Sequence, residues 1–141
     1  MNALTLANMV RNFNKIVDEA ILCGELQPGE QVITHGKTDK LYYRKCEIPA
    51  GSVGATLVHK YDHVSTCLKG DLILVDQDGV RHSVSAGDVF ITKAGTQRAV
   101  IALTDVAFMT VHAVDDIDMD HVEETLGCRS MTEYQHLLEA A

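Results

Sequence analysis

The sequence predicts an all-β fold, a barrel or jelly roll, with an N-terminal amphipathic helix and a short C-terminal helical tail. Between residues 31 and 114 apolar and polar residues alternate with a period of two, and turn residues recur at short intervals. The Asp-Gly pair at 78–79 is typical of a tight β-hairpin. Short strands at such regular spacing are characteristic of β-sandwiches and barrels.

Length and charge limit the classes of function. At 141 residues we expect one globular domain, made of a helix and linker (1–30), the barrel (31–114) and a helical tail (115–141). The chain has 20 acidic and 12 basic residues, for a net charge of −8. Nucleic-acid binders need Lys and Arg to neutralise phosphate, so we expect no nucleic-acid partner.

The sequence shows no apolar run long enough to span a bilayer and no signal-peptide pattern. We therefore expect a cytoplasmic protein without a membrane partner. Association with a virus particle stays open.

Residues 4–22 predict the N-terminal helix. The apolar residues recur at helical spacing: Leu6, Met9, Val10, Phe13, Val17, Ala20 and Ile21. Gly24 follows and suits a left-handed C-terminal cap. The apolar stripe has to pack on the barrel or on a second subunit, and we expect a homodimer or a larger homo-oligomer.

The remaining elements follow from alternation and turn chemistry. Strands are predicted at 32–35, 41–48, 53–59, 64–69, 71–76, 80–84, 89–92, 97–103 and 106–114. A short helix at about 120–126 ends at Gly127. A capping box from Ser130 to Glu133 begins a last helix that runs through Leu138.

The stretch Gly51–Gly70, followed by Gly87, Asp88 and Gly95, resembles the two motifs of the cupin superfamily. The resemblance covers about residues 31–114 and implies a cupin-like double-stranded β-helix. The layout is also loosely similar to short cupin-like proteins carried by bacteriophages, with a leading helix, an HxxxH pair and a short helical tail.

When the sequence is aligned with these two motifs, His59 matches the second histidine of the first motif and His63 takes the position of its glutamate. Leu57 replaces the first histidine, and Arg98 replaces the histidine of the second motif. The scaffold positions are kept, whereas the ligand positions are kept only in part.

Residues two apart on a strand face the same side, so His59, Tyr61 and His63 would face the interior together if the extended conformation continued. His112, on the last strand with Thr110, is the third histidine of the predicted cluster. Imidazole nitrogens bind divalent transition metals, and the resemblance implies Fe, Mn, Ni or Zn held by His59, His63 and His112. The alternative is that these histidines are hydrogen-bonded or solvent-facing strand residues.

Arg98 is a permanent cation, so it would repel a divalent metal ion. The same guanidinium suits a carboxylate or phosphate ligand through paired hydrogen bonds. We name Arg98, Tyr61 and Thr110 as candidate ligand-contacting residues. For Arg98 the alternative is a surface arginine paired with an acid.

Three functions stay open. The resemblance implies a protein that binds a small molecule, and, if it is an enzyme, metal-assisted isomerase, dioxygenase or lyase chemistry on a small polar or anionic substrate. The loss of two family ligands favours a non-catalytic ligand-binding or sequestering module without metal. The amphipathic terminal segments suit a structural or assembly protein, viral for instance, with a degenerate cavity. The fold alone does not decide between them.

Overall fold

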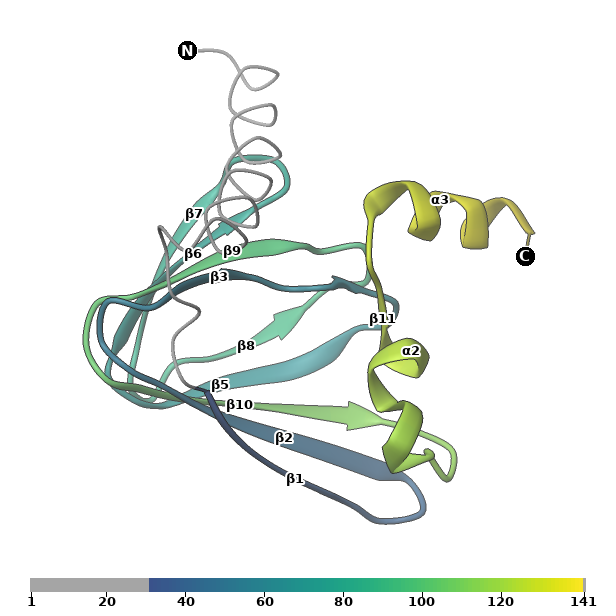
Figure 1. Cartoon of the computed structure of the whole chain (residues 1–141), viewed down its shortest axis with the longest axis horizontal. Helices are drawn as coiled ribbons and strands as arrows, with labels where there is room; N and C mark the ends of the chain where they lie inside the picture. The colour runs from purple at the N-terminus through teal and green to yellow at the C-terminus, as the bar shows by residue number, and fades with distance from the viewer. Residues whose placement is uncertain (1–30, 141) are drawn as a thin grey trace.

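Strands dominate the part of the chain that the structure, a computed structural model, describes, residues 31–140 (Figure 1). They are β1 (Val32–Lys37), β2 (Leu41–Ile48), β3 (Val53–Ala55), β4 (Val58–His59), β5 (His63–Lys69), β6 (Asp71–Asp76), β7 (Arg81–Ser85), β8 (Val89–Thr92), β9 (Arg98–Ala102), β10 (Val106–Ala113) and β11 (Gly127–Cys128). The helical elements are η1 (Met119–His121), α2 (Val122–Leu126) and α3 (Met131–Ala140). The predicted fold class is confirmed; the predicted N-terminal helix lies outside the described residues.

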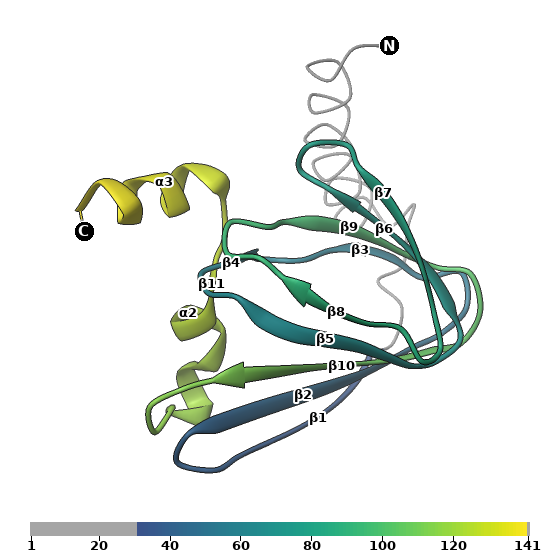
Figure 2. The same ribbon diagram turned by 180° about the vertical axis from the view of Figure 1, so that it is seen from behind.

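Two antiparallel sheets face each other across the barrel (Figures 1 and 2). One has the strand order β1-β2-β10-β5-β8 and the other has the order β3-β9-β6-β7. We call their inner faces the floor and the roof, respectively. Sequence neighbours β5 and β6 lie in different sheets, as in a jelly roll, so each sheet joins strands from distant parts of the chain.

The alternation seen in the sequence reappears as alternating burial. Along β5, His63, Ser65 and Cys67 are buried, whereas Val64 and Leu68 are exposed. The apolar core lies at the closed end of the barrel, where both sheets contribute side chains. Its fully buried members are Cys67, Leu72, Leu74, Val84, Ala102 and Val106.

The predicted strand at 53–59 is in fact two strands. Between β3 and β4, the Thr56 backbone N–H donates to the Arg98 carbonyl, and Thr56 Oγ1 accepts from the Arg98 N–H at 3.0 Å. These bonds take the chain out of the regular ladder, because a threonine hydroxyl replaces a backbone carbonyl as the acceptor. The predicted helix at 120–126 likewise begins as the 3-10 turn η1.

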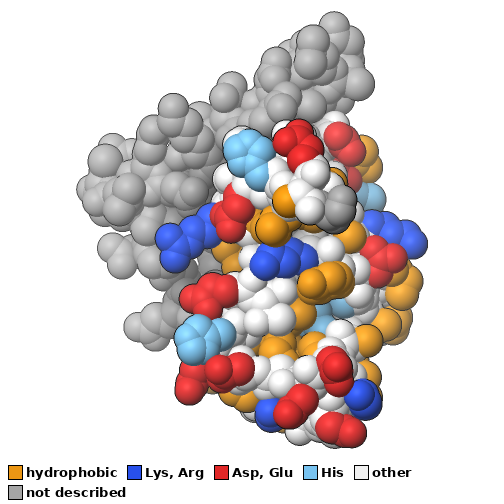
Figure 3. All heavy atoms as spheres, turned by 90° about the vertical axis from the view of Figure 1, so that its right-hand side faces the viewer, with side chains coloured by type: hydrophobic (Ala, Val, Ile, Leu, Met, Phe, Trp, Pro, Cys, Tyr) orange, Lys and Arg blue, Asp and Glu red, His pale blue; other side chains and the backbone are white. Residues whose placement is uncertain are grey.

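The tail after β10 covers the open end of the barrel. Ile117 and Val122 pack on the buried ring of Tyr42, and β11 pairs with β4 through Gly127 and His59. Figure 3 looks onto this end, where acidic and basic side chains lie near one another. Two rim lysines bind tail carboxylates, Lys37 with Asp116 at 3.2 Å and Lys40 with Asp115 at 2.8 Å.

In residues 31–140 there is no helix with the length and apolar character to cross a membrane.

We predict that Gly70→Ala destabilises the protein more than Gly51→Ala. Both glycines have positive φ, +83° and +81°, so either alanine adds conformational strain of about 1 kcal/mol. A Cβ at Gly70 would also collide with the Asp105 carbonyl oxygen, whereas a Cβ at Gly51 meets nothing within 4 Å. Urea unfolding should show an additional loss of about 2 kcal/mol for Gly70→Ala. Equal losses for the two variants would contradict this packing argument.

Candidate ligand cavity

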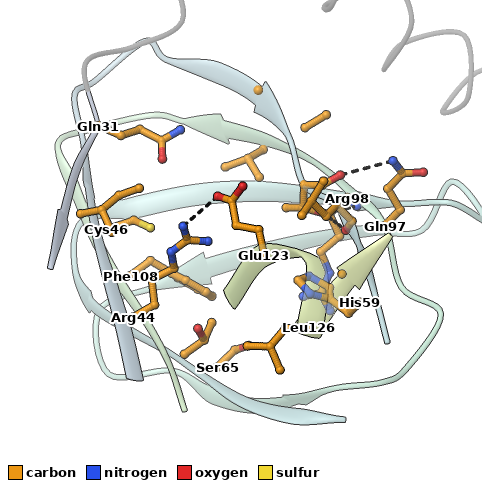
Figure 4. A pocket seen from close by; sticks show the side chains of 18 of the residues that line it. Gln31, Arg44, Cys46, His59, Ser65, Gln97, Arg98, Phe108, Glu123 and Leu126 are labelled. Carbon is orange, nitrogen blue, oxygen red and sulfur yellow. Dashed lines mark hydrogen bonds and ion pairs between the residues drawn. The ribbon is translucent and has the colours of Figure 1, made fainter. Parts of the chain in front are cut away.

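A cavity of about 600 Å³ lies between floor and roof, and the tail helix α2 contributes to its wall (Figure 4). Its volume is in the range of pockets that hold small molecules. The charged and polar residues that line it are Gln31, Arg44, Ser52, Thr56, His59, His63, Ser65, Gln97, Arg98, Thr110, His112, Glu123 and Arg129, with Tyr42 beside them.

Three histidines from three strands meet in this cavity. The ring centroids of His59 and His63 are 4.6 Å apart, and those of His63 and His112 are 4.3 Å apart. His63 Nδ1 lies 3.2 Å from the Tyr61 carbonyl oxygen. A carbonyl can only accept, so Nδ1 carries the proton and the Nε2 lone pair of His63 remains available. His112 Nε2 lies 2.9 Å from Thr110 Oγ1.

Burial keeps these histidines neutral. Burial, with a smaller contribution from the neighbouring His63, lowers the pKa of His59 from 6.5 to about 3 and that of His112 to about 4. Burial also lowers the pKa of His63, although the hydrogen bond to the Tyr61 carbonyl opposes the effect. At neutral pH the cavity therefore holds three uncharged imidazoles, each able to donate one hydrogen bond and accept another.

Arg98 brings a positive charge into this neutral group. Its Nη1 donates to Thr92 Oγ1 at 2.9 Å, and that hydroxyl is bonded to Ser65 Oγ at 2.7 Å. The guanidinium carbon lies 5.3 Å from the centre of the Phe90 ring. Burial lowers the pKa of Arg98, while Asp76 opposes that shift, and the side chain stays charged.

No carboxylate within residues 31–140 forms an ion pair with Arg98. Asp76 lies opposite Arg98 in the backbone ladder between β6 and β9, but its side chain does not contact the guanidinium. Its carboxylate instead accepts from the backbone N–H groups of Asp78 and Val80 and contacts His82. Arg98 Nε is buried and has no partner in the described chain, so the guanidinium keeps unused hydrogen-bonding capacity.

Another arginine of the cavity, Arg44, is neutralised by a carboxylate of the tail. Its Nη2 lies 3.0 Å from Glu123 Oε1, and Figure 4 shows the two side chains facing each other inside the cavity. Neither Arg44 nor Glu123 is among the site residues predicted from the sequence. Arg44 lies on the same face of β2 as Tyr42 and Cys46, so the alternation of strand residues predicts that it points inward. Nothing local links it to Glu123, 79 positions away.

Of the other two predicted ligand-contacting residues, Thr110 and Tyr61, only Thr110 lines the cavity. Thr110 lines the cavity and contacts His112. Tyr61 does not line it: its side chain is 56% exposed, because the extended conformation is interrupted between β4 and β5. The parity argument for Tyr61 therefore fails, even though His59 and His63, on either side of the interruption, both reach the cavity.

The histidines have the right donor chemistry for a divalent transition metal but not the arrangement. A metal binds in the plane of an imidazole at a nitrogen lone pair. The rings of His63 and His112 are instead stacked, with 30° between their planes. In the described part of the chain, no group of three or more His, Cys, Asp or Glu side chains is positioned to hold a metal ion. The three rings would have to rotate before they could share one.

Comparison with known proteins identifies the family. The sequence profile of the cupin domain matches residues 44–114, about half of the chain, and the chain therefore belongs to the cupin family. No curated protein matches it in sequence.

Several solved structures share the fold. A cupin-domain protein from Bordetella pertussis is 18% identical, with a TM-score of 0.53 over 63% of this chain and 98% of that one. A putative ethanolamine utilization protein Q from Salmonella typhimurium is 20% identical, with a TM-score of 0.54 over 64% and 74% of the two chains. KdgF from Halomonas sp. is 19% identical, with a TM-score of 0.52 over 66% and 83%. At these identities the similarity describes the fold.

We predict that the buried histidines make folding stability fall as the pH is lowered. In the unfolded chain they take up protons near pH 6.5, but in the folded protein His59 and His112 do so only near pH 3 and pH 4. Between these values the unfolded state binds more protons, so stability decreases as the pH falls below about 6.5. In chelator-treated protein, His112→Asn should reduce the loss of unfolding free energy between pH 7 and pH 5 by about 2 kcal/mol.

The matched control is His136→Asn, because His136 is exposed on α3. That variant should keep the pH dependence of the parent. If urea titrations at the two pH values gave His112→Asn the same dependence as well, His112 would not be a buried neutral histidine.

Proposed function

We propose that this cupin binds a small anionic molecule, such as a carboxylate, in its cavity, with Arg98 as the anchoring cation. The observation that carries the proposal is the half-buried Arg98 guanidinium, which lines the cavity without a carboxylate partner among residues 31–140. Hydrogen bonds between guanidinium and carboxylate are strong and directional, and they gain strength away from water. The proposal requires no metal.

The surroundings of Arg98 support this function. The neutral histidines add no positive charge, but the N–H groups of His59 and His112 can donate to an oxyanion, and the free Nε2 of His63 can accept from a ligand hydroxyl. Thr92 and Ser65 are almost fully buried; Thr92 accepts a hydrogen bond from the guanidinium, and its hydroxyl is fixed by a second hydrogen bond with Ser65. An anchor that is ordered before binding loses little side-chain entropy when the ligand arrives.

A second candidate is a divalent transition metal, Fe, Mn, Ni or Zn, held by His59, His63 and His112 after their rings reorient. The favouring observation is the contact of three neutral imidazoles within one cavity. The nearby charge of Arg98 acts against it, since a cation in a partly buried site repels a second one. A metal held by these histidines would act as a Lewis acid on an anionic substrate in the same cavity.

We predict that Arg98→Gln removes anion binding. Sodium hexanoate and inorganic phosphate, each titrated calorimetrically at constant ionic strength, serve as the probes. Loss of a charge-assisted pair should weaken binding of the bound probe by about 10- to 100-fold. Arg81→Gln is the control, because Arg81 is exposed on β7 and does not line the cavity. Equal weakening by both variants would point to general surface charge and contradict the proposal.

The second candidate predicts near-stoichiometric metal in protein purified without a histidine tag, measured by elemental mass spectrometry. The metal should be lost in His59→Ala/His63→Ala and kept in His82→Ala/His136→Ala, whose histidines are exposed outside the cavity. A folded parent without metal, even after incubation with Zn²⁺ or Fe²⁺, would eliminate this candidate and leave the anion proposal intact.

A further inference from the structure

We propose that the ligand is amphipathic, an acid with an anionic head at the tail end of the cavity and a hydrocarbon body at the closed end. The inference rests on the proposed function, because the head is anchored by Arg98. It goes further by assigning the chemistry of the rest of the molecule.

The polarity of the floor changes abruptly along the strands. Neighbouring side chains on β2, β10 and β5 form rows across the sheet, and two successive rows are polar before the next becomes apolar. From the tail end inward, these rows are Tyr42–His112, Arg44–Thr110–Ser65 and Cys46–Phe108–Cys67. A single step of two residues along each strand thus separates the polar floor from the apolar floor.

The roof changes in the same direction. Along β9 the inward residues are Arg98, Val100 and Ala102, and Leu74 and Leu72 on β6 lie beside the last two. The two polar ends coincide, because Arg98 reaches across to Thr92, which pairs with His63 in the floor. Floor and roof therefore form one cavity with a polar end and an apolar end.

The apolar end is not completely filled by the side chains of residues 31–140. Ile48, Val100 and Phe108 point inward and line the cavity, yet each is only partly buried. Figure 4 shows Cys46 and Phe108 on one side of the cavity and His59 and Arg98 on the other. Water in contact with such an apolar wall finds few hydrogen-bond partners, so its replacement by hydrocarbon is favourable.

The test is isothermal titration of the full-length protein with butanoate, hexanoate and octanoate, and with hexan-1-ol as the uncharged analogue of hexanoate. Each added methylene should tighten binding about three- to fourfold, because burying a CH₂ group is favourable by about 0.8 kcal/mol. Octanoate should then bind about 200-fold more tightly than butanoate, and hexan-1-ol should bind far more weakly than hexanoate.

A pair of isosteric variants locates the hydrocarbon. Val100→Thr puts a hydroxyl on the apolar wall and should weaken octanoate binding several-fold more than butanoate binding. Val111→Thr makes the same change on β10 at a position that does not line the cavity, and should leave both affinities unchanged. Urea unfolding of each variant shows that the comparison is made on folded protein.

The outcomes separate the two proposals. Equal affinities for the three acids, each weakened by Arg98→Gln, would overturn the amphipathic ligand and leave the anion site standing. Hexan-1-ol binding as tightly as hexanoate would overturn the anion site and keep the apolar pocket. No binding of any of the three acids or of inorganic phosphate to folded protein would overturn both.

Discussion

The antiparallel ladder that joins β2, β10 and β5 determines which side chains meet inside this barrel. Its register brings Arg44, Thr110 and Ser65 into one row although they come from distant parts of the chain. Because residues alternate between the two faces, every inward position is set once the register is set. The cavity, its histidine cluster and its apolar end all depend on this pairing.

Desolvation determines which side chains of the cavity are charged. The same burial that makes His59 and His112 neutral cannot discharge Arg98, since a guanidinium holds its proton far more strongly than an imidazolium. Arg98, a cation without a carboxylate partner among residues 31–140, thus stands beside three uncharged imidazoles. Such an arrangement attracts an anion and weakens the case for a metal ion. This distinction follows from side-chain chemistry and not from membership of the cupin family, whose fold serves many functions.

The tail shows how a charged segment completes the site. Its carboxylates meet the rim lysines Lys37 and Lys40, and Glu123 meets Arg44 at the cavity wall. Each of these pairs is partly exposed, so each contributes little stability by itself. The packing of Ile117 and Val122 on Tyr42 and the short pairing of β11 with β4 hold the tail in place. As a consequence, Arg44 is neutralised, whereas Arg98 has no carboxylate partner among residues 31–140.

The sequence by itself determined the strand pattern, the turns and the inward direction of most residues, because alternation is a local property that burial imposes on neighbouring positions. It also indicated that His59, His63 and His112 would lie near one another. Tyr61 shows where local reasoning ends: the chain leaves the ladder between β4 and β5, and parity no longer applies. Only the tertiary structure decided that His63 and His112 stack, that Glu123 pairs with Arg44, and that Arg98 lacks a carboxylate among residues 31–140. These facts depend on distances between residues far apart in the chain, which are set by ladder register and tail packing and leave no local trace in the sequence.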